Sequence, residues 1–485
     1  MLAEEMERAN TSYGHPRAAE LAARLADPAT VVIVAGQQAG LFGGPLFSLT
    51  KMIGVAKWAQ ELEQRGVPAV GVFWVATEDH DYREIARCVL GAEPESLEAG
   101  DDEQPLMPVG MRTWGAGIER VLHRARELYP GEESEPALAA LSSAFRADAR
   151  VGEAFSRFMV WLLGERSPLL LDSMLPALKE AEKPWLRTLV ERRVDVAEAL
   201  GAAGRRVDEA GYKLQVRSSP EASPLFLLHG ERRCRILWNG DAHFTLRGTE
   251  KSEAERRPVK ELLEAIEENP SVVSPGVLAR PVIQDAVLGS GLQLMGPGEL
   301  AYMTQAAALY PVLGVDAPIT SLRPQILVLE SKQRRRLRQL DMTLEEALAS
   351  EADLEDRLAR RAGIEFLDDA RQRLLAEVDD LGVRALAIDS QLERPLQKTR
   401  SQVENALNLF SQKVVASASR QDSTSRQRLE DVRSRCLPLG TPQERTLSTA
   451  HFALTYGRDF AASVWDQMAL NSDRIQIIEP RNRNA

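Results

Sequence analysis

The densest group of reactive side chains in the chain is a run of four at positions 78–81, Glu78-Asp79-His80-Asp81. The run follows VFWVAT, so we expect it at the carboxyl end of a buried strand. A carboxylate beside an imidazole fixes its tautomer and raises its pKa, which suits general acid–base catalysis. We predict that His80 is an acid–base group held by Asp79 or Asp81, with Glu78 orienting an ammonium group or a metal ion.

The same run has two other interpretations. Aspartate caps helix N-termini well, so the run could begin the next helix, with its other charges in solvent. Its oxygen atoms could instead bind a metal ion, and oxygen ligands favour Mg²⁺ over Zn²⁺. The sequence leaves catalysis, capping and metal binding open, and we assign no metal ligand.

Two glycine-rich segments follow predicted strands and could bind an anion. Gly43 and Gly44 follow the apolar run 31–36, and Gly296 follows LQLM. Glycine lets an anion approach backbone amides, whose dipoles at a helix N-terminus favour negative charge. We predict a phosphate or carboxylate cradle, the alternative being tight strand-to-helix turns. The side chains expected to assist there are Gln37, Gln38 and Lys51.

Two further segments carry polar side chains that could contact a substrate, LARPVIQD at 278–285 and PITSLRP at 318–324. The candidates in them are Arg280, Gln284, Asp285 and Arg323. Either arginine could bind a carboxylate through two parallel hydrogen bonds, or pair with an acidic residue at the edge of the core.

The elements that must position these residues form an α/β pattern. Apolar runs at 31–36 and 67–76 flank a segment of helical spacing, which predicts two parallel strands joined by a helix. We predict another buried strand in 167–174, and strand-like runs within 212–247 that include YKLQVR and a hairpin turning near His229. Residues 115–165 are expected to be helical.

A chain of 485 residues exceeds the limit of about 250–300 for one core, so we expect two or three units. The predicted ranges are a core at 1–90, a helical connecting insertion at 91–166, more core at 167–331, a helical arm at 332–440, and a segment packing on core or arm at 441–485. In the arm, apolar or small residues recur in steps of three and four from Leu381 to Val414, with a break or kink at Pro395. The arm could pair with a second chain or fold back as a hairpin.

Composition narrows the class of protein. Hydrophobic residues make up 44% and charged residues 27%, as in globular proteins. A net charge of −11 argues against nucleic acid as a partner. The three cysteines are far apart, which argues against a disulfide framework or a thiolate zinc site. Without a signal peptide or an apolar run of membrane-spanning length, we expect a soluble cytoplasmic protein.

Several segments together resemble the bacillithiol synthase family, the cysteine-adding enzymes called BshC. The matching segments are AGQQAGLFGGPLFSLTK, VFWVATEDHDYREI, LLLDSMLPALKE, GYKLQV, LARPVIQD, MGPGELAYMTQ and TPQERTLSTAHFALTYG. The resemblance implies a Rossmann-like parallel-sheet core with a connecting domain, followed by a C-terminal coiled-coil arm that forms a homodimer. It also implies a ligase that adds L-cysteine to glucosaminyl-malate in the last step of bacillithiol synthesis. The malate carboxylates of that substrate agree with the anion cradle.

Joining a carboxylate to an amine in water needs activation, usually through a phosphoryl or adenylyl intermediate. The chain has no Walker A loop. A nucleotide such as ATP or ADP, with Mg²⁺, is compatible with the reaction, but the sequence assigns it no site. The alternative functions are a binding or scaffold protein that keeps a nucleotide-type fold without ligase activity, and another amide-forming or sugar-modifying enzyme using the same pocket.

Overall fold

The computed structural model describes residues 1–217, 219–240, 242–248, 256–349, 354, 366–421 and 423–481. The described chain divides into two compact units. Unit 1 contains Met1–Val328 and Thr441–Ala485, and unit 2 contains Leu329–Gly440. Parts of the predicted arm and C-terminal segment, including 355–365 and 482–485, lie outside the described residues. No helix in the described ranges is long and apolar enough to cross a membrane.

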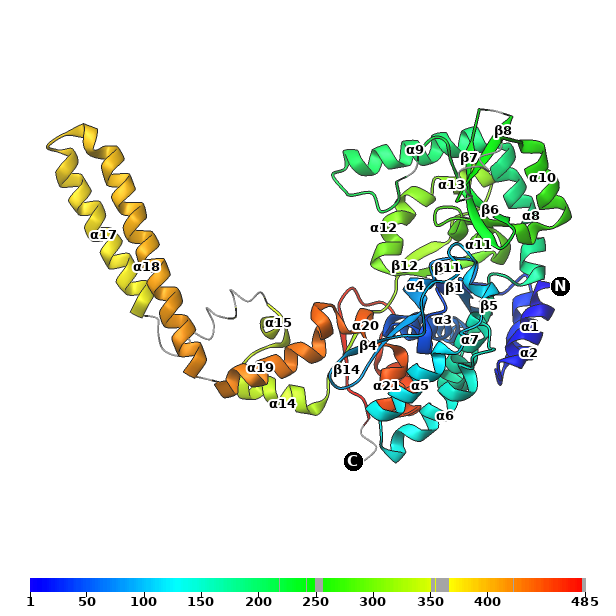
Figure 1. Ribbon diagram of the computed structural model, residues 1–485, viewed down its shortest axis with the longest axis horizontal. Coiled ribbons are helices and arrows are strands. Elements are labelled where there is room, and N and C mark those ends of the chain that lie inside the picture. Colours follow the sequence, from blue (N-terminus) through cyan, green and yellow to red (C-terminus); the bar gives the residue numbers. More distant parts are fainter. Residues whose placement is uncertain are drawn as a thin grey trace. The chain divides into compact units, whose positions relative to one another are not determined.

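Unit 1 is built on a parallel sheet of five strands in the order β12-β11-β1-β2-β5 (Figure 1). The strands are β1 (Val31–Gln37), β2 (Ala69–Val75), β5 (Leu169–Asp172), β11 (Ser290–Met295) and β12 (Ile319–Leu322). Helix α3 (Leu46–Gln64) connects β1 to β2, which pair in parallel from Val31 with Ala69 to Gln37 with Val75. The predicted parallel α/β core is therefore confirmed.

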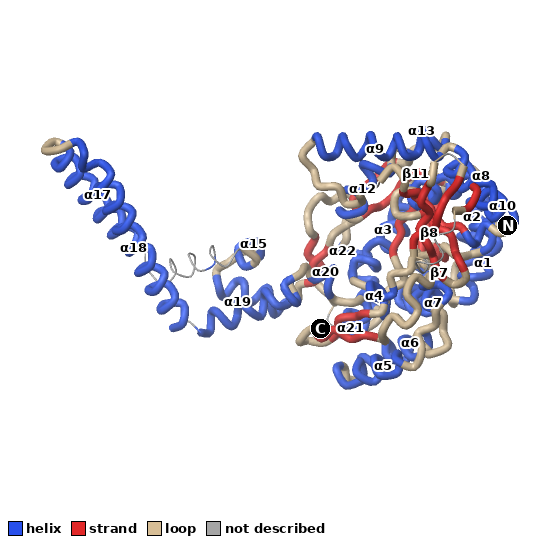
Figure 2. Tube along the Cα trace, turned by 45° about the horizontal axis from the view of Figure 1, so that its top comes forward, coloured by secondary structure: helices blue, strands red, loops and turns tan. Residues whose placement is uncertain are grey.

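Helices cover both faces of this sheet because its strands bury alternate side chains on opposite sides. Val34 and Val72 belong to the hydrophobic cluster with α1 (Leu2–Ser12), α2 (Ala18–Ala26), α8 (Pro176–Glu191) and α11 (Arg280–Leu288). Ile33 and Phe73 belong to a larger cluster with α3 and α7 (Val151–Leu163). The result is a three-layer α/β/α arrangement (Figure 2).

Residues between β2 and β5 extend the larger cluster rather than forming a separate core. They form α4 (Tyr82–Ile85), β3 (Arg87–Leu90), β4 (Glu95–Glu98), α5 (Gly117–Leu128), α6 (Glu135–Ala144) and α7. Phe145 and Phe158 from this segment and Phe452 from near the C-terminus share that cluster. The C-terminal elements of unit 1 are α20 (Gln443–Thr446), α21 (Thr449–Tyr456), α22 (Asp459–Gln467) and β14 (Gln476–Ile478), which pairs with β13 (Ile326–Val328).

A second, antiparallel sheet is formed by the chain between β5 and β11, in the order β10-β6-β7-β8-β9. Its strands are β6 (Ala222–His229), β7 (Arg232–Trp238), β8 (His243–Arg247), β9 (Arg257–Pro258) and β10 (Val273–Pro275). It shares a core with α8, α9 (Arg193–Glu209), α10 (Val259–Glu268), α11, α12 (Pro297–Ala306) and α13 (Leu309–Leu313). The hairpin predicted near His229 is confirmed, whereas the strand predicted for YKLQVR is wrong because 211–217 form no strand.

Unit 2 contains α14 (Ser331–Leu340), α15 (Leu344–Ala347), α17 (Phe366–Leu386), α18 (Glu393–Gln421) and α19 (Ser423–Cys436). Helices α17 and α18 lie side by side and run in opposite directions (Figure 1). Two contacts fix this pairing: Arg371 donates to Asn408 at 3.1 Å, and Arg400 donates to Asp379 at 2.8 Å.

The predicted seam from Leu381 to Val414 is interrupted beside Pro395, where α17 ends and α18 begins, and the fold-back alternative describes the arm. The chain reverses between α17 and α18, where the Asp389 side chain accepts a hydrogen bond from the Gln391 amide at 2.9 Å. Pro395 stands in the first turn of α18, where a missing amide donor breaks no helical bond. Proline therefore belongs to a new helix and does not kink a continuous one.

Candidate active site

A cavity of about 670 Å³ in unit 1 opens where β1, β2 and β11 end, beside the hairpin of β6 and β7. Ligands of open α/β sheets bind at this position. The predicted site residues that line the cavity are Gln37, Gln38, Lys51, Glu78, Asp79, His80, Arg280, Gly296 and Arg323. The predicted residues outside its lining are Gly43, Gly44, Asp81, Gln284 and Asp285.

The backbone after β2 is held by the loop that follows β5. The amides of Thr77 and Glu78 both donate to Ser173 Oγ at 3.0 Å. The Glu78 carboxylate is buried and forms an ion pair with Lys179 of α8, with 2.7 Å between Oε2 and Nζ. This part of the predicted cluster is therefore positioned by two neighbouring strand ends, as the parallel sheet requires.

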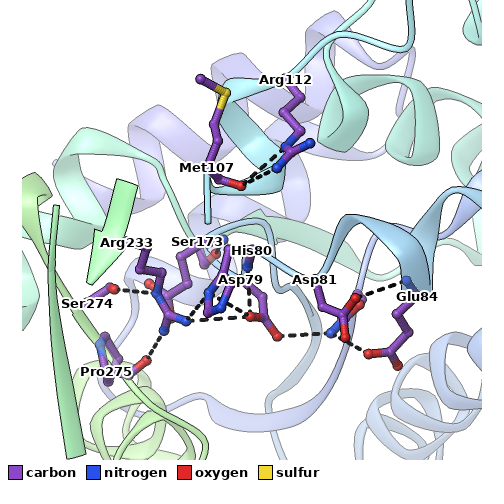
Figure 3. A network of polar contacts seen from close by, with 12 residues as sticks. Asp79, His80, Asp81, Glu84, Met107, Arg112, Ser173, Arg233, Ser274 and Pro275 are labelled. Carbon is purple, nitrogen blue, oxygen red and sulfur yellow. Dashed lines mark hydrogen bonds and ion pairs between the residues drawn. The ribbon is translucent and has the colours of Figure 1, made fainter. Parts of the chain in front are cut away.

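Asp79 and His80 meet Arg233 of β7 inside the cavity (Figure 3). Arg233 NH1 donates to His80 Nδ1 at 3.2 Å and lies 3.5 Å from Asp79 Oδ1. Ser274 Oγ and the Pro275 carbonyl accept further hydrogen bonds from the same guanidinium, each at 2.8 Å. Asp79 also accepts from the backbone amide of His80 at 2.7 Å.

The expected rise in the pKa of His80 is wrong. Burial lowers its pKa, and the positive charge of Arg233 lowers it further, while Asp79 and Asp81 oppose this change. Because a guanidinium can only donate, His80 Nδ1 accepts and the ring proton lies on Nε2. His80 is therefore a neutral imidazole with an N–H to offer.

Asp81 does not hold His80. Its side chain is the N-cap of α4 and accepts a hydrogen bond from the Glu84 amide at 3.2 Å. Figure 3 shows Asp81 and Glu84 on the far side of Asp79 from Arg233. The capping interpretation applies to Asp81, while Asp79 and His80 line the cavity.

Lys51 is a fully buried cation that fixes the turn before α12. Its Nζ donates to the Gly36 carbonyl at 2.7 Å and to Gln37 Oε1 at 3.1 Å, and it pairs with Glu299 Oε2 at 2.5 Å. Burial lowers the pKa of Lys51, an effect that Glu299 opposes. Glu299 also accepts from the Gly296 amide at 2.7 Å. This internal contact uses a donor that the cradle hypothesis reserved for a ligand.

Both predicted arginines line the cavity, but they differ in whether a carboxylate pairs with them. Arg323, 1% exposed, makes a bidentate ion pair with Glu444 of α20, at 2.8 and 2.6 Å. Arg280 donates to the Tyr302 hydroxyl at 3.2 Å, and no carboxylate of the described chain lies within ion-pair distance of it. Arg280 is therefore free to pair with an anion.

The glycines after β1 are packed against protein, which corrects the cradle prediction for them. Gly43 has a φ of +85°, and a Cβ there would lie 3.0 Å from both Met159 and Thr449. Gly44 has a φ of +63°, and its Cβ would lie 3.2 Å from Ser48 Oγ. Both positions need glycine for the turn, and Gly43 also needs it for close packing with α7 and α21, as the alternative stated.

Gln284 and Asp285 are buried within α11 and do not face the cavity. Asp285 accepts a hydrogen bond from the Tyr310 hydroxyl at 2.5 Å, and burial raises its pKa to about 6. Both residues lie on α11, just before β11 begins at Ser290, and the helix buries both side chains in the core.

Sequence reasoning missed the residues that complete the site: Lys179, Arg233, Glu299 and Tyr302. One available signal was strand alternation, which puts Arg233 and Arg235 on one face of β7, and both line the cavity. Lys179 gave no signal, because a lysine three residues before a glutamate is usual on an exposed helix surface.

Comparison with known proteins gives a consistent result along the chain. The description "Bacillithiol biosynthesis BshC, N-terminal Rossmann-like domain" matches residues 1–324, and "Bacillithiol biosynthesis BshC, C-terminal coiled-coil domain" matches residues 326–480. A Salinibacter ruber protein named "Putative cysteine ligase BshC" is 30% identical over 89% of this chain and 80% of its own length. A protein of the same name from Thermus thermophilus is 31% identical over 90% of this chain and 86% of its own length.

Among solved structures, methionyl-tRNA synthetase of Mycobacterium tuberculosis bound by methionyl-adenylate aligns with 90% of this chain and 91% of that chain. Its sequence identity is 11% and its TM-score 0.24, which is too low to support an inference.

Proposed function

The chain belongs to the BshC family of bacillithiol biosynthesis, and from this premise we propose that it is a ligase joining L-cysteine to glucosaminyl-malate through an amide bond. The observation that carries the proposal is Arg280, a cavity guanidinium without a carboxylate partner in the described chain. The malate part of the acceptor supplies two carboxylates, and a guanidinium binds a carboxylate through two parallel hydrogen bonds.

Arg280 is suited to this task because its neighbours leave it room. Gly36 of β1 lies beside it, and a Cβ at Gly36 would come within 3.3 Å of Arg280 NH1. Lys51 and Arg323 carry their own carboxylate partners, Glu299 and Glu444. The substrate carboxylate therefore pairs with Arg280, while the other two cations maintain the cavity walls.

His80 enters the reaction as a hydrogen-bond donor. Its Nδ1 is engaged by Arg233, so the Nε2–H is the group that can contact a substrate. When an amine attacks a carboxyl carbon, negative charge develops on the carboxyl oxygen, and a donor beside that oxygen stabilises the transition state. This role as a donor differs from the acid–base role predicted from the sequence.

We further propose that a nucleotide such as ATP, with Mg²⁺, activates the carboxyl group. No group of three His, Cys, Asp or Glu in the described ranges is placed to hold a metal ion. The expected Mg²⁺ ligands are therefore the nucleotide phosphates and water, which commonly bind Mg²⁺ in phosphoryl-transfer sites. Product formation should require both ATP and Mg²⁺, and equal product without them would contradict this part.

The function is tested by gene deletion and thiol profiling. We expect loss of bacillithiol, accumulation of glucosaminyl-malate, and restoration by the wild-type gene. The Arg280→Gln protein should fail to restore the thiol. The control is Arg187→Gln, which removes a half-exposed arginine paired with Glu191 on α8, away from the cavity lining, and should restore it. An unchanged thiol profile after deletion would refute the proposed function.

We also propose that the arm forms a homodimer. Leu409 and Phe410 of α18 are 60% and 59% exposed, and Leu374 of α17 is 47% exposed. Large apolar side chains exposed on paired helices are typical of protein interfaces. A second copy of this chain is the partner we expect.

A further inference from the structure

Three charged side chains lie buried together behind the acidic wall of the cavity. Lys179 Nζ is 2.7 Å from Glu78 Oε2 and 2.8 Å from Glu182 Oε2. The side chains of Glu78, Lys179 and Glu182 are 5%, 3% and 0% exposed. Burying three charges is costly, and replacing such groups with apolar ones is often neutral or stabilising. The group is therefore expected to serve the function of the cavity.

The local fold places Glu78, one member of this group, in the lining of the cavity. Glu78 follows β2 and its amide is held by Ser173, while α8 begins three residues beyond Ser173 and brings Lys179 under the strand end. Lys179 Nζ donates a hydrogen bond to Glu78 Oε2. The other oxygen, Oε1, is buried, has no hydrogen-bond partner, and belongs to a residue that lines the cavity.

The two glutamates keep Lys179 charged beside the cavity wall. Burial lowers the pKa of Lys179, but Glu182 and Glu78 more than offset this, and the net pKa is raised, so Lys179 stays a cation. Burial raises the pKa of Glu182. Lys179 takes one oxygen of Glu78, and the other oxygen, buried without a hydrogen-bond partner, requires a donor from the ligand.

We propose that Glu78 binds a primary ammonium group of a substrate through Oε1, and that Lys179 and Glu182 are positioning residues that hold and orient its carboxylate. The inference rests on the proposed function and deepens it. In the cavity, Glu78 then provides a place for a cation, and Arg280 of α11 provides a place for an anion. Both substrates, the amino sugar and cysteine, carry an ammonium group.

Titration calorimetry with the full chain tests the contact. Glucosaminyl-malate is compared with its N-acetylated form, and L-cysteine with N-acetyl-cysteine, because acetylation removes the positive charge. The wild type should prefer one amine ligand by roughly 10- to 150-fold, the range for hydrogen bonds to charged groups. Glu78→Gln should abolish that preference and leave affinity for the acetylated form within about twofold.

The control is Glu84→Gln, which removes a charge from another carboxylate of the same cavity and should keep the preference. A preference in the sugar pair assigns Glu78 to the amino sugar, and one in the cysteine pair assigns it to cysteine. No preference in either pair, or a preference that persists in Glu78→Gln, overturns the inference while leaving the proposed function standing. Absence of glucosaminyl-malate binding to the wild type refutes the proposed function itself.

The positioning role is tested with the double variant Lys179→Met/Glu182→Gln. It removes one cation and one anion together, so the net charge of the buried group is kept and folding is favoured over the single Lys179 variant. We expect it to lose the amine preference as Glu78→Gln does. Lys183→Met, on the same helix and paired with Glu180, is the control that keeps it. A folded double variant with the wild-type preference would show that Lys179 serves structure alone.

Discussion

Arg323 and Arg280 line the same cavity, yet their replacement by methionine should have opposite consequences. Arg323→Met leaves the buried Glu444 carboxylate without its bidentate partner. Removing one member of a buried ion pair costs about 3–5 kcal/mol. Arg280→Met removes a guanidinium that has no carboxylate partner among the described residues, so stability should stay the same or rise. Affinity for a malate-containing ligand should instead fall roughly 10- to 150-fold, as expected for a lost charged hydrogen bond of about 1.5–3 kcal/mol.

Urea unfolding followed by tryptophan fluorescence measures the first effect. All seven tryptophans lie in unit 1, so the signal reports the unit that contains the cavity. Arg323→Met should lower the urea midpoint by roughly 1 M. Arg323→Met/Glu444→Leu should recover much of the loss, because an apolar pair replaces the ion pair. Equal destabilisation by the two arginine variants, or a folded Arg323→Met with the larger loss of affinity, would refute this reasoning.

Four other predictions follow from particular contacts. Asp81→Ala should lower the free energy of unfolding by about 0.5–2 kcal/mol, because it removes the cap of α4. His80→Ala should leave the unfolding midpoint near wild type and reduce turnover roughly 10²- to 10³-fold. The reverse pattern would exclude His80 from the chemistry. Because burial raises the folded pKa of Asp285 to about 6 from 3.8, its contribution to stability is present below pH 4 and is lost as pH rises to 6. Asp285→Asn should then be more stable than wild type at pH 7, by up to about 3 kcal/mol, with no such gain at pH 4; urea midpoints at both pH values check this. Gly43→Val should destabilise the fold by roughly 2–5 kcal/mol through its positive φ and overpacking, and a stable variant that loses only malate affinity would restore the cradle hypothesis. Light scattering should find a dimer that Phe410→Glu dissociates, and a stable monomeric wild type would contradict the arm interface.

The sequence by itself determined the parallel core and the edge at which chemistry should occur. Two β-branched runs flanking a helical segment specify β1, α3 and β2 through local periodicity, and the polar run at 78–81 begins just after the second strand ends. Because carboxyl ends of parallel strands meet at one edge, Gln38 and Asp79 were predictable neighbours. In the structure Gln38 Nε2 donates to Asp79 Oδ2 at 3.0 Å.

Only the tertiary structure decided which charges are available to a substrate. Lys51, Arg280 and Arg323 are equivalent in the sequence as cations near strand or helix ends. Their roles differ because two of them have a carboxylate partner. Glu299, one helical turn after Gly296, pairs with Lys51, and Glu444, more than 100 residues beyond Arg323 in the sequence, pairs with Arg323. Pairing of this kind depends on the geometry of packed elements, which local spacing does not encode.

The same reason explains the glycine turn and the arm. The segment around Gly43 is glycine-rich, as an anion cradle would be. The space beside Gly43 is instead occupied by α7 and α21, which lie more than 100 and more than 400 residues further along the chain. In the arm, the spacing of three and four residues between apolar positions continues across the point where the chain reverses its direction. This spacing shows which positions are apolar, but it does not show the direction in which the chain runs. Hydrogen bonds between Arg371 and Asn408 and between Arg400 and Asp379 set that direction, and they form only when the two helices are already side by side.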